Sequence, residues 1–317
     1  MTVAAAPTLV QLQAAHERIA RHIHRTPVIT SALLDTHCGA SLFFKCENLQ
    51  KAGAFKARGA LNAVLGLADD VAAAGVATHS SGNHGAALAM AAARRGIPCH
   101  VVMPRTAAAV KKAAVAAYGG RIIECEPTQR GRESTLEAVV AATGAHVVHP
   151  YNDARTIAGQ GTAALELMQQ VPELDIVVVP VGGGGLLAGT ALAVKSLQPE
   201  TEVMAVEPAG ADDAFRSFGL GERQQLDHPD TIADGLRSNL GELNFSVMLE
   251  HVDTIVTVPD SLTVEAMRLQ WTRLKTVVEP SGAVSFAGVL DNPQRFRDRR
   301  VGVIITGGNV DLEALPW

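Results

Sequence analysis

The feature that most constrains the fold of this chain is the repeated alternation of short apolar runs with segments of helix length. Apolar runs at residues 75–79, 99–103 and 121–125 are each followed by a segment with helical periodicity. The run at 175–181 is almost continuously apolar, which is typical of a central parallel strand. Because this is the order of βαβ units, we expect an α/β fold in which helices cover both faces of mostly parallel sheets.

The alternation is interrupted near residue 150, where the sequence reads Tyr151-Asn152-Asp153. We therefore expect two open, twisted sheets with a cleft between them. A helix is expected to begin near residue 60, and residues 209–244 are expected to be irregular because they are rich in Asp, Gly and Pro. The other expected elements are helices at 85–95, 107–118, 133–142, 161–170, 186–197 and 263–275 and strands at 41–47, 202–206, 254–258 and 301–305.

Composition argues against several classes of protein. The net charge of −5 and the pI near 6.1 disfavour nucleic acid as the main partner. The first ten residues lack the pattern of a secretory signal, and no uncharged apolar stretch is long enough to span a bilayer. The four cysteines form no C-x-x-C pair and are expected to be reduced thiols. These features predict a soluble, cytoplasmic protein without membrane contact.

One lysine, Lys56, is the leading candidate for covalent chemistry. Three glycine-rich turns, at residues 80–85, 182–185 and 306–309, each follow a short apolar run and could surround a small phosphorylated cofactor. A desolvated lysine amine forms a Schiff base with an aldehyde, so Lys56 could anchor such a cofactor. The alternative is that Lys56 is an ordinary solvated surface charge.

The four-glycine turn at 182–185 lies between an expected strand and an expected helix. Its backbone N–H groups can converge on a phosphate at the positive end of the helix dipole. A simple tight turn is one alternative. A second alternative is a dinucleotide-binding loop, since Gly183, Gly185 and Ala188 satisfy the loose G-x-G-x-x-G/A pattern and Glu207 closes the next strand. That alternative leaves the lysine and the other two turns without a role.

Five segments together resemble the fold-type II pyridoxal-phosphate enzymes and, within them, the serine racemase and serine/threonine dehydratase family. They are Ala54-Phe55-Lys56 with Arg58-Gly59-Ala60, Ser80-Ser81-Gly82-Asn83-His84-Gly85, Ala158-Gly159-Gln160-Gly161-Thr162, the four-glycine turn, and Gly307-Gly308-Asn309. The resemblance covers nearly the whole chain in the family's order and spacing. It implies a tryptophan synthase β-like fold with the cofactor in the cleft between two domains. The large domain would comprise residues 1–66 and 153–317, and the small, mobile domain residues 67–152.

The resemblance also implies how pyridoxal 5'-phosphate is held. Lys56 would carry it as a Schiff base and, once released, remove the proton from the substrate Cα. Phe55 would pack on the cofactor ring, and Asn83 would hydrogen-bond its phenolic oxygen. Thr306 stands near the pyridine nitrogen, where relatives often carry serine, and its neutral hydroxyl leaves that nitrogen largely unprotonated. The phosphate would be bound by Gly182, Gly183, Gly184 and Gly185.

The implied substrate site contains a second catalytic residue and a candidate for specificity. Ser81 would be an acid or base on the cofactor face opposite the lysine, as racemisation requires, or it could merely cap the following helix. Arg132 aligns with a racemase-type arginine that can reach a second carboxylate, or it could be an exposed arginine at a helix start. Glu279 is expected near the cofactor, without an assigned role. The substrate carboxylate would be bound by Ser80, Ser81, Gly82, Asn83 and His84.

Residues 207–213 match the divalent-cation site of the family. The carboxylates of Glu207 and Asp213 and the carbonyl oxygen of Ala211 would bind Mg²⁺ or Ca²⁺, which prefer oxygen ligands. The alternative is an acidic surface loop. The resemblance further implies that the protein is a homodimer.

The predicted function is that of a pyridoxal-phosphate-dependent dehydratase, an ammonia-lyase that converts L-serine or L-threonine to a 2-oxo acid and ammonia. Serine racemisation through Ser81 would accompany it. An alternative within this class is dehydration of 3-hydroxyaspartate to oxaloacetate and ammonia, which Arg132 would favour. Outside this class, the chain could be a nucleotide-dependent oxidoreductase or a non-catalytic ligand-binding relative. The first would lack the absorbance of a lysine–cofactor Schiff base, and the second would release no ammonia.

Overall fold

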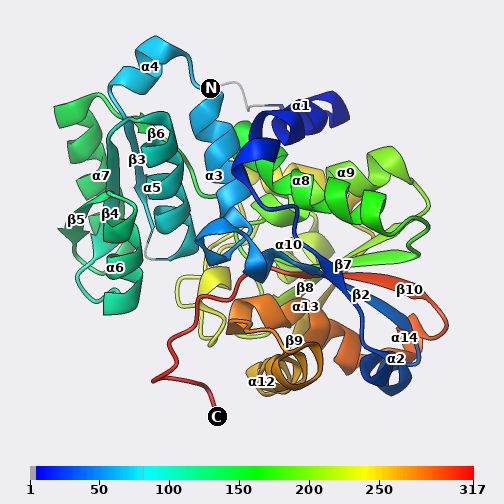
Figure 1. Ribbon diagram of the computed structural model, residues 1–317. Coiled ribbons are helices and arrows are strands. Elements are labelled where there is room, and N and C mark those ends of the chain that lie inside the picture. The colour runs from blue at the N-terminus through cyan, green and yellow to red at the C-terminus, as the bar shows by residue number, and fades with distance from the viewer. Residues whose placement is uncertain (1–4, 81) are drawn as a thin grey trace.

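The computed structural model describes residues 5–80 and 82–317 and contains two β-sheets in separate parts of the molecule (Figure 1). The smaller sheet consists, in spatial order, of β5 (Arg121–Cys125), β4 (Cys99–Pro104), β3 (Val76–His79) and β6 (His146–Val147). All of its strand pairs are parallel. This sheet is formed entirely by residues before the predicted break near residue 150.

The larger sheet consists, in spatial order, of β1 (Val28–Ile29), β2 (Ser41–Cys46), β10 (Arg300–Ile305), β7 (Ile176–Pro180), β8 (Glu202–Pro208) and β9 (Thr254–Val258). It is parallel except for β1, which pairs with β2 in the antiparallel direction. The α/β class with two mostly parallel sheets, predicted from the alternation, is therefore confirmed.

Strand β7 shows why the larger sheet is covered on both faces. Its residues Ile176, Val177, Val178 and Val179 are all fully buried. Because successive side chains of a strand point to opposite faces, Val177 and Val179 enter one apolar core while Ile176 and Val178 enter the other. A central parallel strand is buried on both faces, and the near-continuous apolar run in the sequence meets this requirement.

Helices cover both faces of each sheet (Figure 1). On the larger sheet, α1 (Leu9–Ile19), α8 (Ala154–Gln170), α9 (Gly185–Leu197), α10 (Asp213–Leu220) and α11 (Glu242–His251) cover one face. The other face is covered by α2 (Ala32–Cys38), α12 (Asp260–Leu269), α13 (Pro280–Asp291) and α14 (Pro293–Phe296).

The smaller sheet has α5 (Asn83–Arg95) and α6 (Ala109–Ala117) on one face and α7 (Gln129–Thr143) on the other, with the short α4 (Asp69–Ala73) beside it. Helix α3 (Lys56–Leu65) packs against both α5 and α8. The helix that carries the candidate lysine therefore lies where the two sheets' helical layers meet.

Three expected helix starts were too late, including that of α7, which begins at Gln129 rather than at residue 133. Helix α8 begins about two turns before the expected residue 161, at an N-cap where Asp153 accepts the Thr156 N–H. The glycines within α8 suggested a later start, but they serve close packing. A Cβ at Gly159 would lie 2.6 Å from the Arg58 carbonyl oxygen, and one at Gly161 would lie 2.7 Å from that of Gly189.

Helix α3 begins at Lys56 rather than near residue 60, so the candidate lysine lies in the first helical turn. The segment 209–244, expected to be irregular, contains α10 and the start of α11. Its high Gly, Asp and Pro content concealed α10, which ends at Gly221 in the left-handed conformation with φ 69°.

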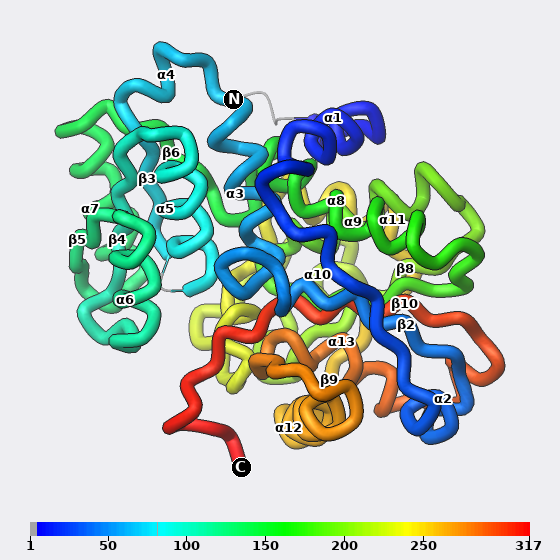
Figure 2. The backbone as a smooth tube through the Cα atoms, viewed as in Figure 1, coloured from blue at the N-terminus to red at the C-terminus, as the bar shows by residue number. Residues whose placement is uncertain are grey.

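The last residues of the chain run from the end of β10 to the neighbourhood of α12 (Figure 2). There the Trp317 ring meets the Trp271 ring edge-on, with centroids 5.3 Å apart. The four cysteines are buried free thiols. In residues 5–80 and 82–317, no helix combines the length and the apolar character that crossing a membrane requires.

Candidate active site

A cavity of about 770 Å³ opens where the carboxyl ends of strands from both sheets meet. Its wall includes Lys56 at the start of α3, Ser80 after β3, the glycine turn after β7 and Thr306 after β10. Ligands of parallel α/β sheets bind at this edge because the βα turns present helix N-termini and free N–H groups there. The three glycine-rich turns singled out in the sequence are thus brought to one cavity.

Lys56 is held on the cavity wall by its neighbours. Its Nζ donates to the carbonyl oxygen of Pro150 at 2.9 Å and lies 4.9 Å from the centroid of the Phe55 ring. The preceding Phe55 N–H donates to the Thr306 carbonyl oxygen at 2.9 Å, which ties this turn to the end of β10. Burial lowers the pKa of Lys56 to about 8, so a useful fraction of the amine is neutral near pH 7. A neutral amine is the form that attacks an aldehyde.

The glycine turn has the features of a phosphate site. Within the part of the chain that the structure describes, the N–H groups of Gly182, Gly183 and Gly184 donate no hydrogen bond. They lie at the N-terminus of the 13-residue helix α9, where the helix dipole favours an anion. Gly184 has φ 87°, a conformation that favours glycine. The residues of this turn therefore fit the phosphate of pyridoxal phosphate.

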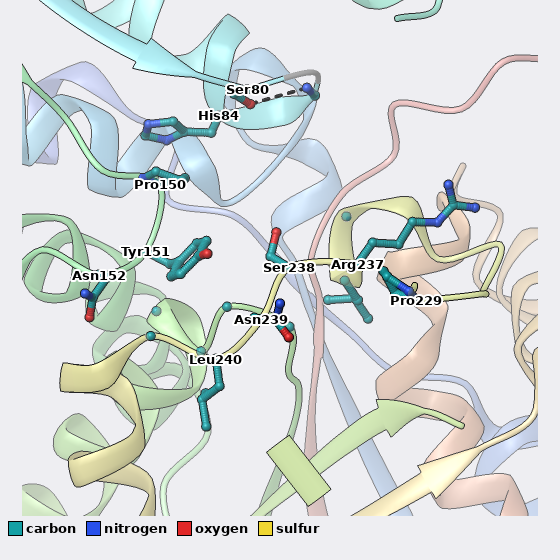
Figure 3. Close-up of a pocket in the computed structure, with 18 of the residues that line it drawn as sticks. Ser80, His84, Pro150, Tyr151, Asn152, Pro229, Arg237, Ser238, Asn239 and Leu240 are labelled. Atoms are coloured by element: carbon teal, nitrogen blue, oxygen red, sulfur yellow. Dashed lines mark hydrogen bonds between the residues drawn. The ribbon is translucent and has the colours of Figure 1, made fainter. Parts of the chain in front are cut away.

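The turn after β3 is held by Ser80, whose Oγ accepts the N–H groups of Gly82 at 3.3 Å and Gly85 at 3.2 Å (Figure 3). His84 is buried, and its Nε2 lies 3.2 Å from the Val148 carbonyl oxygen. Burial lowers the pKa of His84 to about 3, so the ring is neutral and donates from Nε2. The predicted catalytic Ser81 lies outside the described residues, and its role stays a prediction.

Asn83 begins helix α5 and lines the same cavity. Its Nδ2 donates to Glu279 Oε1 at 2.8 Å, and its Oδ1 accepts from Asn309 Nδ2 at 3.0 Å. Thr306 is buried in the cavity wall with a neutral hydroxyl. The residues predicted to contact the cofactor ring are thus gathered around Lys56.

Arg132 lies in the first turn of α7 and lines the cavity. It is half-buried, and its Nε is buried without a hydrogen-bond partner among the described residues. Burial and the Arg132 charge both lower the pKa of His79, which ends β3. The cavity therefore contains a cationic group able to pair with an anionic ligand.

Sequence reasoning missed a wall formed by the segment that joins the two sheets. The Nδ1 atom of His149 accepts the Asn152 N–H at 2.9 Å and the Tyr151 N–H at 3.3 Å, so the neutral ring carries its proton on Nε2. Burial lowers the pKa of His149 to about 4, with smaller contributions from His79 and Lys56. The only sign of this wall in the sequence is the break near residue 150, and that break does not indicate where the side chains point.

A second unpredicted wall comes from residues 223–241, which lie in the segment predicted to be irregular. Arg223, Ser238 and Asn239 line the cavity from this side. Figure 3 shows the Tyr151 ring projecting across the cavity toward Ser238 and Asn239. Segments this far apart in the chain carry no shared sequence pattern.

The predicted cation ligands lie outside the cavity wall. Glu207 ends β8, and its carboxylate accepts the N–H groups of Ala214 at 3.1 Å and Phe215 at 2.8 Å. Asp213 begins α10 and accepts the Leu240 N–H at 2.7 Å. Burial and the nearby Asp213 charge raise the pKa of Glu207 to about 9, and burial raises that of Asp213 to about 6.

Two adjacent buried carboxyl groups with raised pKa values form a donor set that fits a hard divalent cation. Ala211, the third predicted ligand, is buried beside them and would contribute its carbonyl oxygen. In the described residues no salt bridge reaches Glu207 or Asp213, and no group of three His, Cys, Asp or Glu side chains gathers there. The metal site stays a prediction.

The dinucleotide alternative required Glu207 to bind a ribose beside the glycine turn. Glu207 is absent from the described cavity wall, and its carboxylate accepts two backbone N–H groups of α10 instead. The arrangement of an amine, free N–H groups at a helix start and a neutral hydroxyl is instead the set that pyridoxal phosphate requires.

Comparison with known proteins agrees with this site. Residues 19–307 match the family described as pyridoxal-phosphate dependent enzyme. The chain belongs to the fold-type II pyridoxal-phosphate-dependent enzymes of the serine racemase and threonine deaminase family.

Within this family, the chain is similar to a beta-hydroxyaspartate dehydratase from Paracoccus denitrificans, with 57% identity over 98% of this chain and 99% of the relative. It is also similar to a serine racemase from Arabidopsis thaliana, with 50% identity over 98% of this chain and 95% of the relative. The solved structure of maize serine racemase superposes with a TM-score of 0.96 at 46% identity, over 98% of this chain and 95% of that one.

Proposed function

We propose that this protein is a pyridoxal-phosphate-dependent dehydratase that converts 3-hydroxyaspartate to oxaloacetate and ammonia. The observation that carries this proposal is Arg132, a cation on the cavity wall whose Nε has no hydrogen-bond partner among the described residues. The similarity to a beta-hydroxyaspartate dehydratase supports the same substrate. The expectation from the family resemblance that serine or threonine is the main substrate thus gives way to the dicarboxylate alternative.

Arg132 would discriminate through its charge. A planar guanidinium binds a carboxylate with two parallel hydrogen bonds, so the second carboxylate of 3-hydroxyaspartate gives it a complete partner. Serine and threonine leave the group unpaired in a partly buried site. An unpaired polar group of this kind costs about 1–3 kcal/mol, and more when it is charged. The expected preference for the dicarboxylate is therefore at least about tenfold.

The chemistry needs a base beside the substrate Cα. When bound, pyridoxal phosphate supplies an electron sink for the negative charge that develops at this carbon. Lys56, whose pKa burial lowers to about 8, removes the Cα proton. The hydroxyl group leaves the substrate Cβ and takes up the proton that Lys56 removed from Cα, so that water forms and a Cα–Cβ double bond remains. The released enamine then adds water and loses ammonia, which gives the 2-oxo acid.

Other residues would hold the reactants. The turn from Ser80 to His84 would bind the substrate's first carboxylate, and Phe55 would pack on the cofactor ring. Glu207, Asp213 and the Ala211 carbonyl oxygen would hold Mg²⁺ or Ca²⁺ as a structural cation. We propose that residues 67–152 form a small domain that closes over the substrate, and that two copies of the chain form a homodimer. The proposed substrate does not depend on the domain boundary or on the dimer.

Serine racemisation and serine or threonine dehydration are the second candidate. The similarity to serine racemases supports it, and Ser81 would supply the required second acid or base. The two candidates share the removal of the Cα proton by Lys56. Racemisation adds the return of a proton to the opposite face of Cα, and the substrates differ in the group that occupies the space beside Arg132.

The test is the release of 2-oxo acid and ammonia by the cofactor-loaded protein. The substrates are the 3-hydroxyaspartate stereoisomers, L-serine, D-serine and L-threonine, and Lys56→Ala is the inactive control. We expect the highest kcat/KM with a 3-hydroxyaspartate isomer and oxaloacetate as its product. A higher kcat/KM with serine or threonine, or formation of D-serine from L-serine, would support the second candidate, and an absence of any 2-oxo acid would overturn the proposed dehydration.

A further inference from the structure

The amide of Asn83, on the smaller sheet's side, is held by two residues from the larger sheet's side, Asn309 after β10 and Glu279 at the start of α13. Asn309 Nδ2 donates to its Oδ1 at 3.0 Å, and its own Nδ2 donates to Glu279 Oε1 at 2.8 Å. Rotation of the amide by half a turn would place donor against donor and acceptor against acceptor, so its orientation is determined. One N–H of Nδ2 remains for the cavity that Asn83 lines.

Asn309 is itself anchored near the lysine. Its Nδ2 also donates to the carbonyl oxygen of Ala52 at 2.8 Å, in the loop that leads to Lys56. A Cβ at Gly53 would lie 2.2 Å from Asn309 Oδ1, so the loop and this side chain are in close contact. The same side chain therefore joins the lysine loop to the start of helix α5.

Glu279 is fixed even more firmly. It precedes Pro280 at the N-cap of α13, its side chain is almost completely buried, and its N–H donates to the Gly307 carbonyl oxygen at 3.1 Å. A Cβ at Gly307 would lie 2.4 Å from Glu279 Oε1, so only glycine allows the carboxyl group this position. The carboxyl oxygen that receives the Asn83 amide has no freedom to move away from it.

Burial of Glu279 favours the neutral form of its carboxyl group. Burial is the largest effect and the Asp234 charge adds to it, while the Asn83 amide and Lys111 act in the opposite direction, and together they raise the pKa of Glu279 to about 8. Lys111 and Asp234 form an ion pair with each other, so their effects partly cancel. A neutral acid beside the cofactor ring would not repel the ring's phenolic oxygen.

We propose that Glu279 is a positioning residue for the cofactor: its carboxyl oxygen holds the Asn83 amide so that the free N–H serves the phenolic oxygen of pyridoxal phosphate. This inference rests on the proposed role of Asn83 and is independent of which amino acid is the substrate. It also explains why helix α5, on the smaller sheet, must be joined to α13 and to the turn after β10 before the cofactor site is complete.

The test measures binding of pyridoxal phosphate to the cofactor-free protein, followed by the absorbance of the bound cofactor. Glu279→Gln keeps the acceptor oxygen, so we expect its dissociation constant to stay within about twofold of wild type. Glu279→Ala removes the acceptor, so we expect affinity to fall about tenfold or more and the absorbance of the bound cofactor to shift. Glu265→Gln, the same change on the exposed side of α12, is the matched control and is expected to bind as wild type.

A double-mutant cycle separates positioning from simple packing. If Glu279 acts through Asn83, Glu279→Ala adds little to the loss already caused by Asn83→Ala. Equal losses in both backgrounds, or wild-type binding by Glu279→Ala, would overturn the proposal. If Glu279→Ala does not fold, Glu279→Met fills a similar volume without an acceptor and is used in the same cycle. Because the readout is cofactor binding, a failure to process 3-hydroxyaspartate would overturn the proposed function and leave this inference standing.

Discussion

The guanidinium of Arg58 donates from Nε to Glu47 Oε2 at 2.7 Å, and both side chains are completely buried. The same guanidinium donates to Glu166 of α8 at 2.8 Å, and Glu166 also accepts from Lys45 at 2.7 Å. Two cations and two anions therefore neutralise one another inside the protein. Because Arg58 lies two residues after the candidate lysine, this cluster fixes the first turn of α3 to the turn that follows β2 and to α8.

Replacing Arg58 with alanine should strongly destabilise the protein. The change removes the ion-pair partner of Glu47 and leaves Glu166 paired with Lys45 alone, so we expect the free energy of unfolding to fall by about 3–5 kcal/mol. Urea unfolding of the cofactor-free protein measures it. Arg105→Ala, which removes an exposed pair with Glu126, is the control and should change stability by less than about 1 kcal/mol. A loss of that small size for Arg58→Ala would show that the cluster does not stabilise α3.

The fold was predictable where the sequence pattern is local. The apolar run of β7 and the glycines after it predicted a central strand, a tight turn and a helix, and the structure has all three. The start of α8 was not predictable, because Gly159 and Gly161 look like helix breakers until α3 and α9 are placed against them. Close helix packing is a tertiary requirement, and local propensity does not contain it.

The same distinction applies to the candidate site: residues in short motifs were predictable, and residues that meet only in the folded chain were not. Lys56, Asn83 and the glycine turn lie in short motifs, so their type and order indicated the chemistry. His149, Tyr151 and the wall at residues 223–241 join the cavity only when the two sheets come together, and no motif marks them. Their contribution could be found only from the folded chain.

The rate at which Lys56 captures pyridoxal phosphate should rise with pH. Burial lowers the pKa of Lys56 to about 8, and only the neutral amine attacks the aldehyde. Below about 8 the rate should increase roughly tenfold for each pH unit, and above it the rate should level off. Stopped-flow absorbance of the cofactor-free protein measures this rate. A rise that continues to about 10 would mean that the Lys56 amine keeps its ordinary pKa.

Gly183→Ala should disturb the phosphate turn through one neighbour. A Cβ at Gly183 would lie 2.4 Å from the Tyr151 ring, too close for any side chain. We expect lower stability and weaker cofactor binding, with part of the stability loss relieved when Tyr151→Ala is combined with it. Gly219→Ala is the control, since nothing lies within 4 Å of its Cβ and alanine favours the helix. Additive losses in the double variant would place the strain elsewhere.

Divalent cations should stabilise the protein through Glu207 and Asp213. The raised pKa values of these two carboxyl groups mean that the folded state keeps protons bound at pH values where the unfolded state has already released them. Without a cation, stability should therefore fall as pH rises from about 4.5 toward about 9, the window between the ordinary and raised pKa of Glu207. Mg²⁺ or Ca²⁺ should raise the Tm, and more at high pH than at low pH, because protons compete for the same oxygens.

Glu207→Gln should abolish the cation's effect on the Tm, whereas the exposed Glu222→Gln should leave it unchanged. Differential scanning calorimetry over this pH range, with and without chelator, makes the comparison. An equal rise in Tm for Glu207→Gln and wild type would place the cation at another site.

The substrate preference of Arg132 variants tests the central claim most directly. The quantity is kcat/KM for 3-hydroxyaspartate divided by that for L-serine, measured for wild type, Arg132→Lys and Arg132→Ala. If Arg132 binds the second carboxylate, this ratio should exceed one in wild type, fall about tenfold or more in Arg132→Ala, and lie between these values in Arg132→Lys. A ratio below one in wild type, or one that Arg132→Ala leaves unchanged, would contradict the account of this protein as a dicarboxylate-selective dehydratase.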